Sequence, residues 1–344
     1  MKVVFYGASV TAQRFNSGYY QVLQERLAKS SLVVTIDRVA YGASHLDWAG
    51  FAMIDKVLEL KPDICFLDWV TPSSSEFCPE KIHFISKLLL DRGCLPVWVL
   101  LPRMDDYSCR RTCCDQLRNY ALEHNIPCHE LLKETGIVQA ELADLLRDVV
   151  HTTEQGAVKY SEYFFKLIQY YSEIRIADLY SLARDTYKSH DEVGAPPAIY
   201  SVDGEVSIKS SLEIKVITDL ETRSGGAVEV FLFARIGPRI PCLSFKVHTD
   251  AGGLVHKQSL NFADPWCYYE RNMLLSLPVI QPGLRTEVTF LLEAEKVDPF
   301  ESVDLRQPLK DPSSSFNDRV LPFFEVVVHG GSVKDIKLQD VCNR

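Results

Sequence analysis

Apolar and polar residues follow two different patterns along this chain, and the pattern changes near residue 172. Before that point, short continuous apolar runs are separated by longer segments with helical spacing. Strands without polar alternation are typical of a parallel sheet covered on both faces, so residues 1–172 are predicted to form a doubly wound α/β domain. The expected strands are residues 3–6, 32–39, 63–67, 96–101 and 126–129, and the expected helices are residues 18–29, 46–60, 81–91, 107–124 and 154–171.

Beyond residue 198 the apolar residues alternate with polar ones in short segments, and glycine-rich turn signals recur between them. Short alternating strands with regular turns indicate an antiparallel β-sandwich or jelly roll. We therefore expect an α/β domain over residues 1–172, a linker over 173–198 and a β-sandwich over 199–344. A cluster of aromatic side chains near two carboxylates favours aromatic filling of the core over a carbohydrate site, and both interpretations stay open: Trp266, Tyr268 and Tyr269 stand near Asp264 and Glu270.

The composition narrows the function classes. The formal net charge of −9 and the lack of a basic patch argue against nucleic acid as a partner. The longest apolar stretches are strand-sized, so we expect no membrane span. One lysine precedes the first strand and the ten cysteines lack a Cys-x-x-Cys pair, so we expect a cytoplasmic protein with reduced thiols, no signal peptide and no metal. A zinc site is a disfavoured alternative, since its ligands would have unusual spacings: Cys109, Cys113, Cys128 and His129.

The candidate chemistry begins where the first strand ends. The strand stops at Gly7, and Ser9 follows on the turn, where sites of open α/β sheets form. A serine hydroxyl needs a base to take its proton, and Asp148 and His151 are suited to supply the base and its orienting partner. The alternative is purely local, because Ser9 could cap the first helix and His151 could start the last one. We favour catalysis because three such residues occur together.

Residues 1–172 resemble the SGNH (GDSL-like) hydrolase superfamily. The nucleophile block corresponds to Gly7-Ala8-Ser9, the second block's glycine to Gly42, and the last block to Asp148-Val149-Val150-His151 followed by Gly156. The resemblance implies a flavodoxin-like fold with five parallel strands. It also implies that Ser9 is the nucleophile, His151 the general base and then acid, and Asp148 its orienter. The backbone N–H groups of Ser9 and Gly42 would bind the oxyanion.

The third block departs from the family pattern, which has Gly-x-Asn-Asp after the third strand. No asparagine follows the strand here, so Thr71 or Ser73 is the expected third oxyanion donor. Asp68 and Trp69 lie at the strand end that faces the predicted site, and we expect both to contact substrate. Arg103, beyond the fourth strand, is expected either to bind substrate or to pair with a nearby aspartate.

These residues predict a serine-dependent acyl-ester hydrolase that acts through an acyl-Ser9 intermediate and needs no cofactor. The appended β domain favours deacetylation of a carbohydrate, so the expected partner is a small-molecule or saccharide ester. A carbohydrate O-acetyltransferase of the same fold, using acetyl-CoA or another acyl donor as co-substrate, is the first alternative. A non-catalytic carbohydrate-binding protein is the second, motivated by the missing asparagine.

Overall fold

The computed structural model divides the chain into two compact units, residues 1–195 and residues 196–344, which are described separately. In the first unit the structure describes residues 1–42, 44–72 and 79–187. In the second unit it describes residues 197–201, 206–207, 211–218, 228–236, 244–251, 254–261, 271–277, 287–295, 320–321, 323–329 and 333–340.

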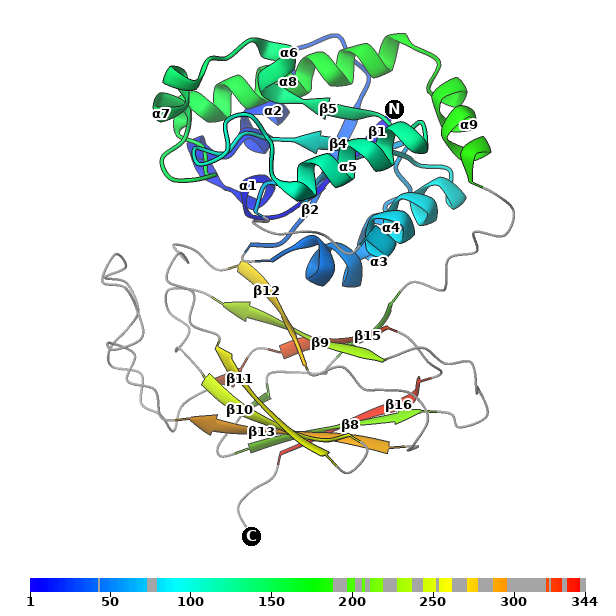
Figure 1. Ribbon diagram of the computed structural model, residues 1–344, viewed down its shortest axis with the longest axis vertical. Coiled ribbons are helices and arrows are strands. Elements are labelled where there is room, and N and C mark those ends of the chain that lie inside the picture. Colours follow the sequence, from blue (N-terminus) through cyan, green and yellow to red (C-terminus); the bar gives the residue numbers. More distant parts are fainter. Residues whose placement is uncertain are drawn as a thin grey trace. The chain divides into compact units, whose positions relative to one another are not determined.

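A five-stranded parallel sheet forms the centre of the first unit, as the apolar runs predict (Figure 1). Its strand order is β2-β1-β3-β4-β5, and all four neighbouring pairs are parallel. The carboxyl ends of these strands therefore share one edge of the sheet, where the candidate residues follow them. The strands are β1 (Lys2–Gly7), β2 (Thr35–Ala40), β3 (Ile64–Asp68), β4 (Leu95–Leu100) and β5 (Cys128–Glu130).

Helices cover both faces of this sheet, and neighbouring residues of β1 show the two faces (Figure 1). The ring of Phe5 packs against Phe164 on α8 (Glu154–Glu173), with ring centroids 5.1 Å apart, on the face that α2 (Tyr19–Ala28) also covers. Tyr6 points to the other face, where its hydroxyl donates to the carbonyl of Ala49 at 2.7 Å. On that face Trp98 of β4 donates to Ser86 of α4 (Pro79–Asp91) at 3.1 Å. Because helices bury both faces of the sheet, residues on both sides of β1, β3 and β4 are mainly apolar, which explains the continuous apolar runs in the sequence.

Two predicted helices begin or end differently in the structure. The helix expected over residues 46–60 is divided into a π-helical turn (Leu46–Gly50) and α3 (Ile54–Leu58). The helix expected from residue 107 begins later, as α5 (Thr112–Glu123). Asp106 explains this later start, because its carboxylate accepts hydrogen bonds from two backbone N–H groups, of Arg110 at 2.9 Å and of Arg111 at 3.3 Å. These bonds stabilise a turn in place of the first helical residues.

Short helices complete the first unit: α1 (Ser9–Ala12), α6 (Leu131–Thr135), α7 (Leu142–Leu145) and α9 (Ile176–Thr186). Helix α9 lies within the segment expected to be a linker. It belongs to the first unit because it packs near α4, where the Tyr180 hydroxyl donates to the carbonyl of Leu90 at 2.7 Å. The first unit therefore extends beyond residue 172. No helix among the described residues has the length and apolar character needed to cross a bilayer.

The second unit contains antiparallel sheets, as its alternating pattern predicts. One sheet has the order β11-β10-β13-β8-β16 and another the order β12-β9-β15-β6, and every described pair in them is antiparallel. Their strands are β6 (Ala198–Ser201), β8 (Ser211–Thr218), β9 (Glu229–Ile236), β10 (Ser244–Ala251), β11 (Leu254–Asn261), β12 (Arg271–Ser276), β13 (Glu287–Glu295), β15 (Phe323–His329) and β16 (Val333–Asp340). A short pair, β7 (Val206–Ser207) and β14 (Val320–Leu321), stands apart. The aromatic cluster of residues 264–270 lies outside the described residues.

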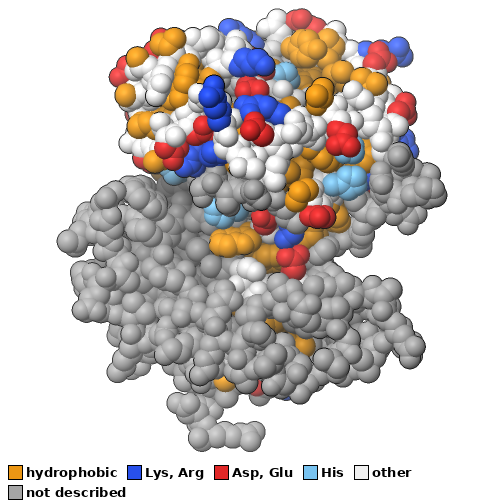
Figure 2. Space-filling model, in the orientation of Figure 1, with side chains coloured by type: hydrophobic (Ala, Val, Ile, Leu, Met, Phe, Trp, Pro, Cys, Tyr) orange, Lys and Arg blue, Asp and Glu red, His pale blue; other side chains and the backbone are white. Residues whose placement is uncertain are grey.

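Charged side chains of both signs lie next to one another on the face of the first unit that Figure 2 shows. Two ion pairs in this unit join Arg111 to Asp106 at 2.8 Å and Arg118 to Glu130 at 2.9 Å. Both arginines are partly buried, so these pairs fix loops and helices as well as balancing charge.

Candidate active site

The turn that carries Ser9 is fixed by close packing at the end of β1. A Cβ atom on Gly7 would lie 2.6 Å from the Thr11 hydroxyl oxygen and 2.9 Å from the carbonyl oxygen of Asp68, so only glycine fits there. The N–H of Ala8 donates to that same carbonyl at 3.0 Å. Ser9 is the first residue of α1 and is half-buried, and the residue that flanks the helix is Ala8. The structure therefore does not support the alternative in which Ser9 caps the helix.

Asp148 and His151 form a hydrogen-bonded pair. The Asp148 oxygens lie 2.9 Å and 3.0 Å from His151 Nδ1, and one of them also accepts the backbone N–H groups of Val150 and His151. Partial burial raises the pKa of Asp148, but the hydrogen bonds from His151 and Val150 outweigh this and lower it to about 2. Asp148 is thus ionised at neutral pH and holds the imidazole by Nδ1, which leaves Nε2 for a substrate or nucleophile.

The helix that follows His151 is capped by a different residue. The Thr153 side chain accepts the N–H of Gly156 at 3.0 Å and is the N-cap of α8. His151 is therefore not needed to start the helix. Gly156, which ends the Asp-x-x-His block, has its own packing reason, because a Cβ there would lie 2.0 Å from the carbonyl oxygen of Leu145.

The end of α1 and the residue after His151 are joined by a buried amide. Gln13, only 3% exposed, accepts the N–H of Thr152 at 3.1 Å and donates to the Thr152 carbonyl at 3.2 Å. It also donates to the carbonyl of Ser17 at 3.2 Å. Because Gln13 lies four residues after Ser9, these bonds bring the serine turn and the histidine loop against each other across 139 positions of sequence.

Gly42 lies beside the serine turn because of the register of β1 and β2. Ala40 pairs with Gly7 in this register, so Gly42 and Ser9 each stand two residues beyond the same pair. The N–H of Tyr41 donates to the Gly7 carbonyl at 3.0 Å, which holds the two turns together. Gly42 is buried. This position suits a backbone oxyanion donor.

The three residues expected to contact substrate are engaged within the protein. Asp68 is 3% exposed, and its carboxylate accepts hydrogen bonds from the hydroxyls of Thr11, at 2.9 Å, and Thr71. Trp69 is fully buried and packs edge-on against Tyr6, with ring centroids 4.9 Å apart. The direction in which a side chain leaves a strand end depends on tertiary packing, and here both side chains pack inside the protein. Contact of Asp68 or Trp69 with substrate stays a prediction.

Arg103 follows the alternative in which it pairs with an aspartate. Its Nε and one Nη donate to the two carboxylate oxygens of Asp105, at 2.7 Å and 2.8 Å, and its other Nη donates to the carbonyl of Thr71 at 2.9 Å. Arg103 is 9% exposed. The guanidinium therefore stabilises the loop after β3, and substrate binding by Arg103 stays a prediction.

The two candidates for the third oxyanion donor are Thr71 and Ser73. The Thr71 hydroxyl is fully buried and donates its hydrogen to Asp68, so it cannot donate to an oxyanion in this arrangement. Thr71 as third oxyanion donor stays a prediction, and it requires this hydrogen bond to be exchanged. Ser73, the other candidate, lies outside the described residues.

Sequence reasoning missed three residues that shape this site: Thr11, Gln13 and Thr152. No motif singles them out, since their partners lie 57 to 139 positions away. The one available signal is that two polar side chains, Thr11 and Gln13, lie in the short segment that follows the serine.

The zinc alternative does not match the placement of His129. One ring nitrogen lies 3.0 Å from a Glu134 oxygen and the other 2.8 Å from the Tyr171 hydroxyl, so both nitrogens are engaged. Among the residues that the structure describes, no group of three or more His, Cys, Asp or Glu side chains is placed to hold a metal ion.

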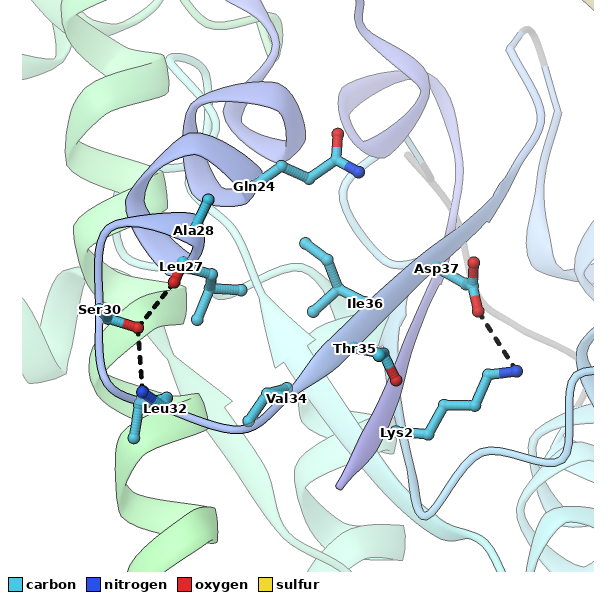
Figure 3. Close-up of a pocket in the computed structure, with 10 residues that line it drawn as sticks. All are labelled: Lys2, Gln24, Leu27, Ala28, Ser30, Leu32, Val34, Thr35, Ile36 and Asp37. Carbon is cyan, nitrogen blue, oxygen red and sulfur yellow. Dashed lines mark hydrogen bonds and ion pairs between the residues drawn. The ribbon is translucent and has the colours of Figure 1, made fainter.

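A shallow hollow of about 690 Å³ lies at the other end of the strands (Figure 3). Its lining includes Lys2 and Asp37, whose charged groups are 3.4 Å apart, and the apolar residues Leu27 and Ile36. Lys2 begins β1, whereas Ser9 follows the end of that strand. The hollow is therefore separate from the candidate active site.

Comparison with known proteins supports the fold. No family model matches the sequence, and no curated protein sequence matches it. A solved structure of a two-domain esterase active on acetylated mannans is 11% identical, with a TM-score of 0.55, over 97% of this chain and 91% of that one. Two further structures cover about half of this chain. An acetyl xylan esterase is 17% identical over 49% of this chain and all of its own, with a TM-score of 0.41. A lipolytic protein of the G-D-S-L family from Veillonella parvula is 14% identical over 50% of this chain and 99% of its own, with a TM-score of 0.40.

The mannan esterase is the informative match, because it aligns with nearly the whole chain. At 11% identity the likeness shows a common fold. The expected fold is therefore confirmed: a five-stranded parallel sheet with helices on both faces, followed along the chain by antiparallel sheets.

Proposed function

We propose that this protein is a carboxylic ester hydrolase that uses Ser9 as nucleophile. The observation that carries the proposal is the Asp148–His151 pair, at 2.9 Å, on a loop that Gln13 joins to the serine helix. An ionised aspartate on Nδ1 orients the imidazole and stabilises the imidazolium that forms when Nε2 takes a proton. This is the arrangement that activates a serine hydroxyl at neutral pH.

In the proposed reaction Ser9 Oγ attacks the ester carbonyl carbon while its proton moves to His151 Nε2. The tetrahedral intermediate collapses, the alcohol leaves with the proton from His151, and an acyl-Ser9 ester remains. Water then repeats the sequence, with His151 as base and Ser9 as leaving group, and releases the acid. The backbone N–H groups of Ser9 and Gly42 would stabilise the oxyanion in both halves, and losing one such donor can cost about 10²–10³ in rate.

For the substrate we propose an acetylated saccharide, and for the C-terminal antiparallel sheets a β-sandwich. The support is the two-part fold shared with an esterase active on acetylated mannans. The same acyl-Ser9 chemistry permits transfer to a sugar hydroxyl, with acetyl-CoA as donor, if the acceptor outcompetes water. We favour hydrolysis because it requires only the ester and water, whereas transfer also requires a bound acceptor.

The test compares wild-type protein with Ser9→Ala on a chromogenic acetate ester and on acetylated mannan. We expect Ser9→Ala to lose about 10⁴–10⁶-fold in kcat, as removal of a triad nucleophile does elsewhere. Ser172→Ala, at an exposed position of α8, is the matched control and should keep wild-type turnover. Equal turnover by wild type and Ser9→Ala would refute the nucleophile. Acetylated acceptor without free acetate, in reactions supplied with acetyl-CoA and saccharide, would replace the hydrolase with the transferase.

A further inference from the structure

A buried carboxylate lies directly beneath the serine turn. Asp68 ends β3, pairs in register with Gly7 at the end of β1, and is 3% exposed. Removing a carboxylate from water is unfavourable unless hydrogen bonds compensate, so a buried aspartate calls for an explanation. Its compensation here includes two threonine hydroxyls, of Thr11 at 2.9 Å and of Thr71.

These two hydroxyls belong to the two segments that must be held in register around a reacting ester. Thr11 lies on α1, two residues after Ser9. On the other side of Ser9, the N–H of Ala8 donates to the main-chain oxygen of Asp68. Thr71 lies in the loop after β3, and its carbonyl group accepts a hydrogen bond from Arg103 at 2.9 Å. Asp68 is thus in contact with both flanks of the nucleophile and with the neighbouring loop at once.

We propose that Asp68 is a positioning residue for the ester hydrolysis proposed above, on which this inference rests. Its carboxylate locks the serine helix to the loop after β3, and its negative charge stabilises the imidazolium that His151 becomes during acylation. In this role Asp68 acts through Thr11, Thr71 and His151 rather than by contact with the substrate. A fixed charge in a poorly solvated site interacts more strongly with a developing charge than it would in water.

The surroundings of Asp68 support an electrostatic role. The facing titratable groups are Tyr19 on α2, whose hydroxyl lies 2.8 Å from that of the α1 threonine, Tyr160 on α8, and His151. Burial raises the pKa of both tyrosines, so they stay neutral. Two arginines bind the segments around Asp68: Arg38 of β2 donates to the carbonyl groups of Thr11 and Gln13, and Arg103 donates to that of Thr71.

The ionisation of Asp68 falls in a range where activity can report it. Burial raises the pKa of Asp68 to about 6, although the hydroxyls of Thr71 and Thr11 and the charge of His151 act to lower it. Below that pH the carboxyl of Asp68 is neutral, so it no longer stabilises the imidazolium of His151 by its charge. One of its oxygens then carries a hydrogen and becomes a donor. The effect of removing this carboxylate is therefore expected to be larger above about pH 6 than below it.

The test uses full-length Asp68→Asn, which keeps the shape of the side chain and removes its charge. We expect kcat to fall about 10–100-fold with KM changed less than about twofold, because loss of alignment and charge affects the transition state more than binding. The difference in kcat between wild type and Asp68→Asn should narrow below about pH 6, where the wild-type carboxyl is itself neutral. Asp91→Asn, on the exposed end of α4, is the matched control and should keep both the rate and its pH profile.

A second pair of variants separates positioning from simple loss of stability. Thr11→Val keeps the shape but removes the hydroxyl, and Thr11→Ser keeps the hydroxyl. We expect the valine variant to lose about 10-fold in kcat and the serine variant to recover most of it, at matched folded fractions measured by circular dichroism. An Asp68→Asn protein with wild-type kcat across the whole pH range would overturn the inference. If Ser9→Ala also kept full turnover, the proposed function would be the one to fail.

Discussion

Replacement of Gln13 by alanine tests the link between the serine helix and the histidine loop. The wild-type amide makes two hydrogen bonds with the backbone of Thr152 and one with the carbonyl of Ser17, all within 3.2 Å. Its oxygen also lies 3.1 Å from the Thr152 hydroxyl, whose single hydrogen is shared with the Ser17 carbonyl at 2.6 Å. Each of the three bonds to backbone groups contributes about 1 kcal/mol net, so their loss should lower the free energy of unfolding by about 3 kcal/mol. The buried N–H of Thr152 would also lose its acceptor, which makes this figure a lower bound unless water enters.

In the first unit of 195 residues, such a loss should lower the melting temperature by about 6–12 °C. It should also lower kcat about 10–100-fold, because a displacement of the histidine loop by about 1 Å is enough for such an effect. Thermal unfolding followed by near-ultraviolet circular dichroism gives the first quantity, and hydrolysis of a chromogenic acetate ester at 25 °C gives the second.

Two further variants sharpen the test. Gln13→Glu keeps the acceptor for the Thr152 N–H but places a buried carboxylate oxygen against the carbonyl oxygens of Thr152 and Ser17, so its melting temperature should fall at least as far as that of Gln13→Ala. Gln21→Ala, on the exposed side of α2, should change neither quantity. The reasoning would be refuted if Gln13→Ala melted and turned over like wild type, since the buried amide would then hold neither segment.

Two predictions concern the block that contains the candidate base. Gly156→Ala would place a Cβ 2.0 Å from the carbonyl oxygen of Leu145, so it should lower the melting temperature by at least about 6 °C, whereas Gly136→Asn, in open space at φ 70°, should lower it by less than about 3 °C. Comparable melting of the two variants would contradict the packing argument. Asp148→Asn should lower kcat about 10⁴-fold by favouring the wrong tautomer of His151. Because the folded-state pKa of Asp148 is lowered to about 2, its stabilising contribution is fully present above about pH 4 and is lost as pH falls towards 2. An acid titration of the asparagine variant should therefore show a shallower loss of stability in that window, and an identical titration would argue against the lowered pKa.

The sequence predicts the five strands and their class because buried parallel strands need continuous apolar residues, a requirement visible in any short window. It does not predict the break in the helix expected over residues 46–60. Gly50 lies at that break, and a Cβ there would be 2.9 Å from the ring of Trp69. Such a contact joins residues that are distant in sequence, so helical periodicity alone cannot reveal it.

In the candidate site, too, some features follow from local sequence and others depend on tertiary packing. Asp148 and His151 are three positions apart, so their pairing follows from local spacing, and the hydrogen bond at 2.9 Å agrees with it. The orientations of Asp68 and Trp69 do not follow from their position at a strand end, because successive residues leave a strand on opposite faces and both faces of this sheet are covered. Burial of both side chains had to be seen in three dimensions.

The loop after β3 shows how hydrogen-bond inventory constrains mechanism. A threonine hydroxyl has one hydrogen to donate, and that of Thr71 goes to Asp68. The same residue that removes this donor from the oxyanion adds a buried negative charge near His151. In the proposed mechanism, backbone N–H groups of Ser9 and Gly42 therefore bind the oxyanion, while Asp68 and Asp148 both act on the imidazolium. In this proposal the oxyanion has two donors and the imidazolium has two aspartates. The reason is the position of Asp68, which accepts the hydroxyl hydrogen of Thr71 in the neighbouring loop.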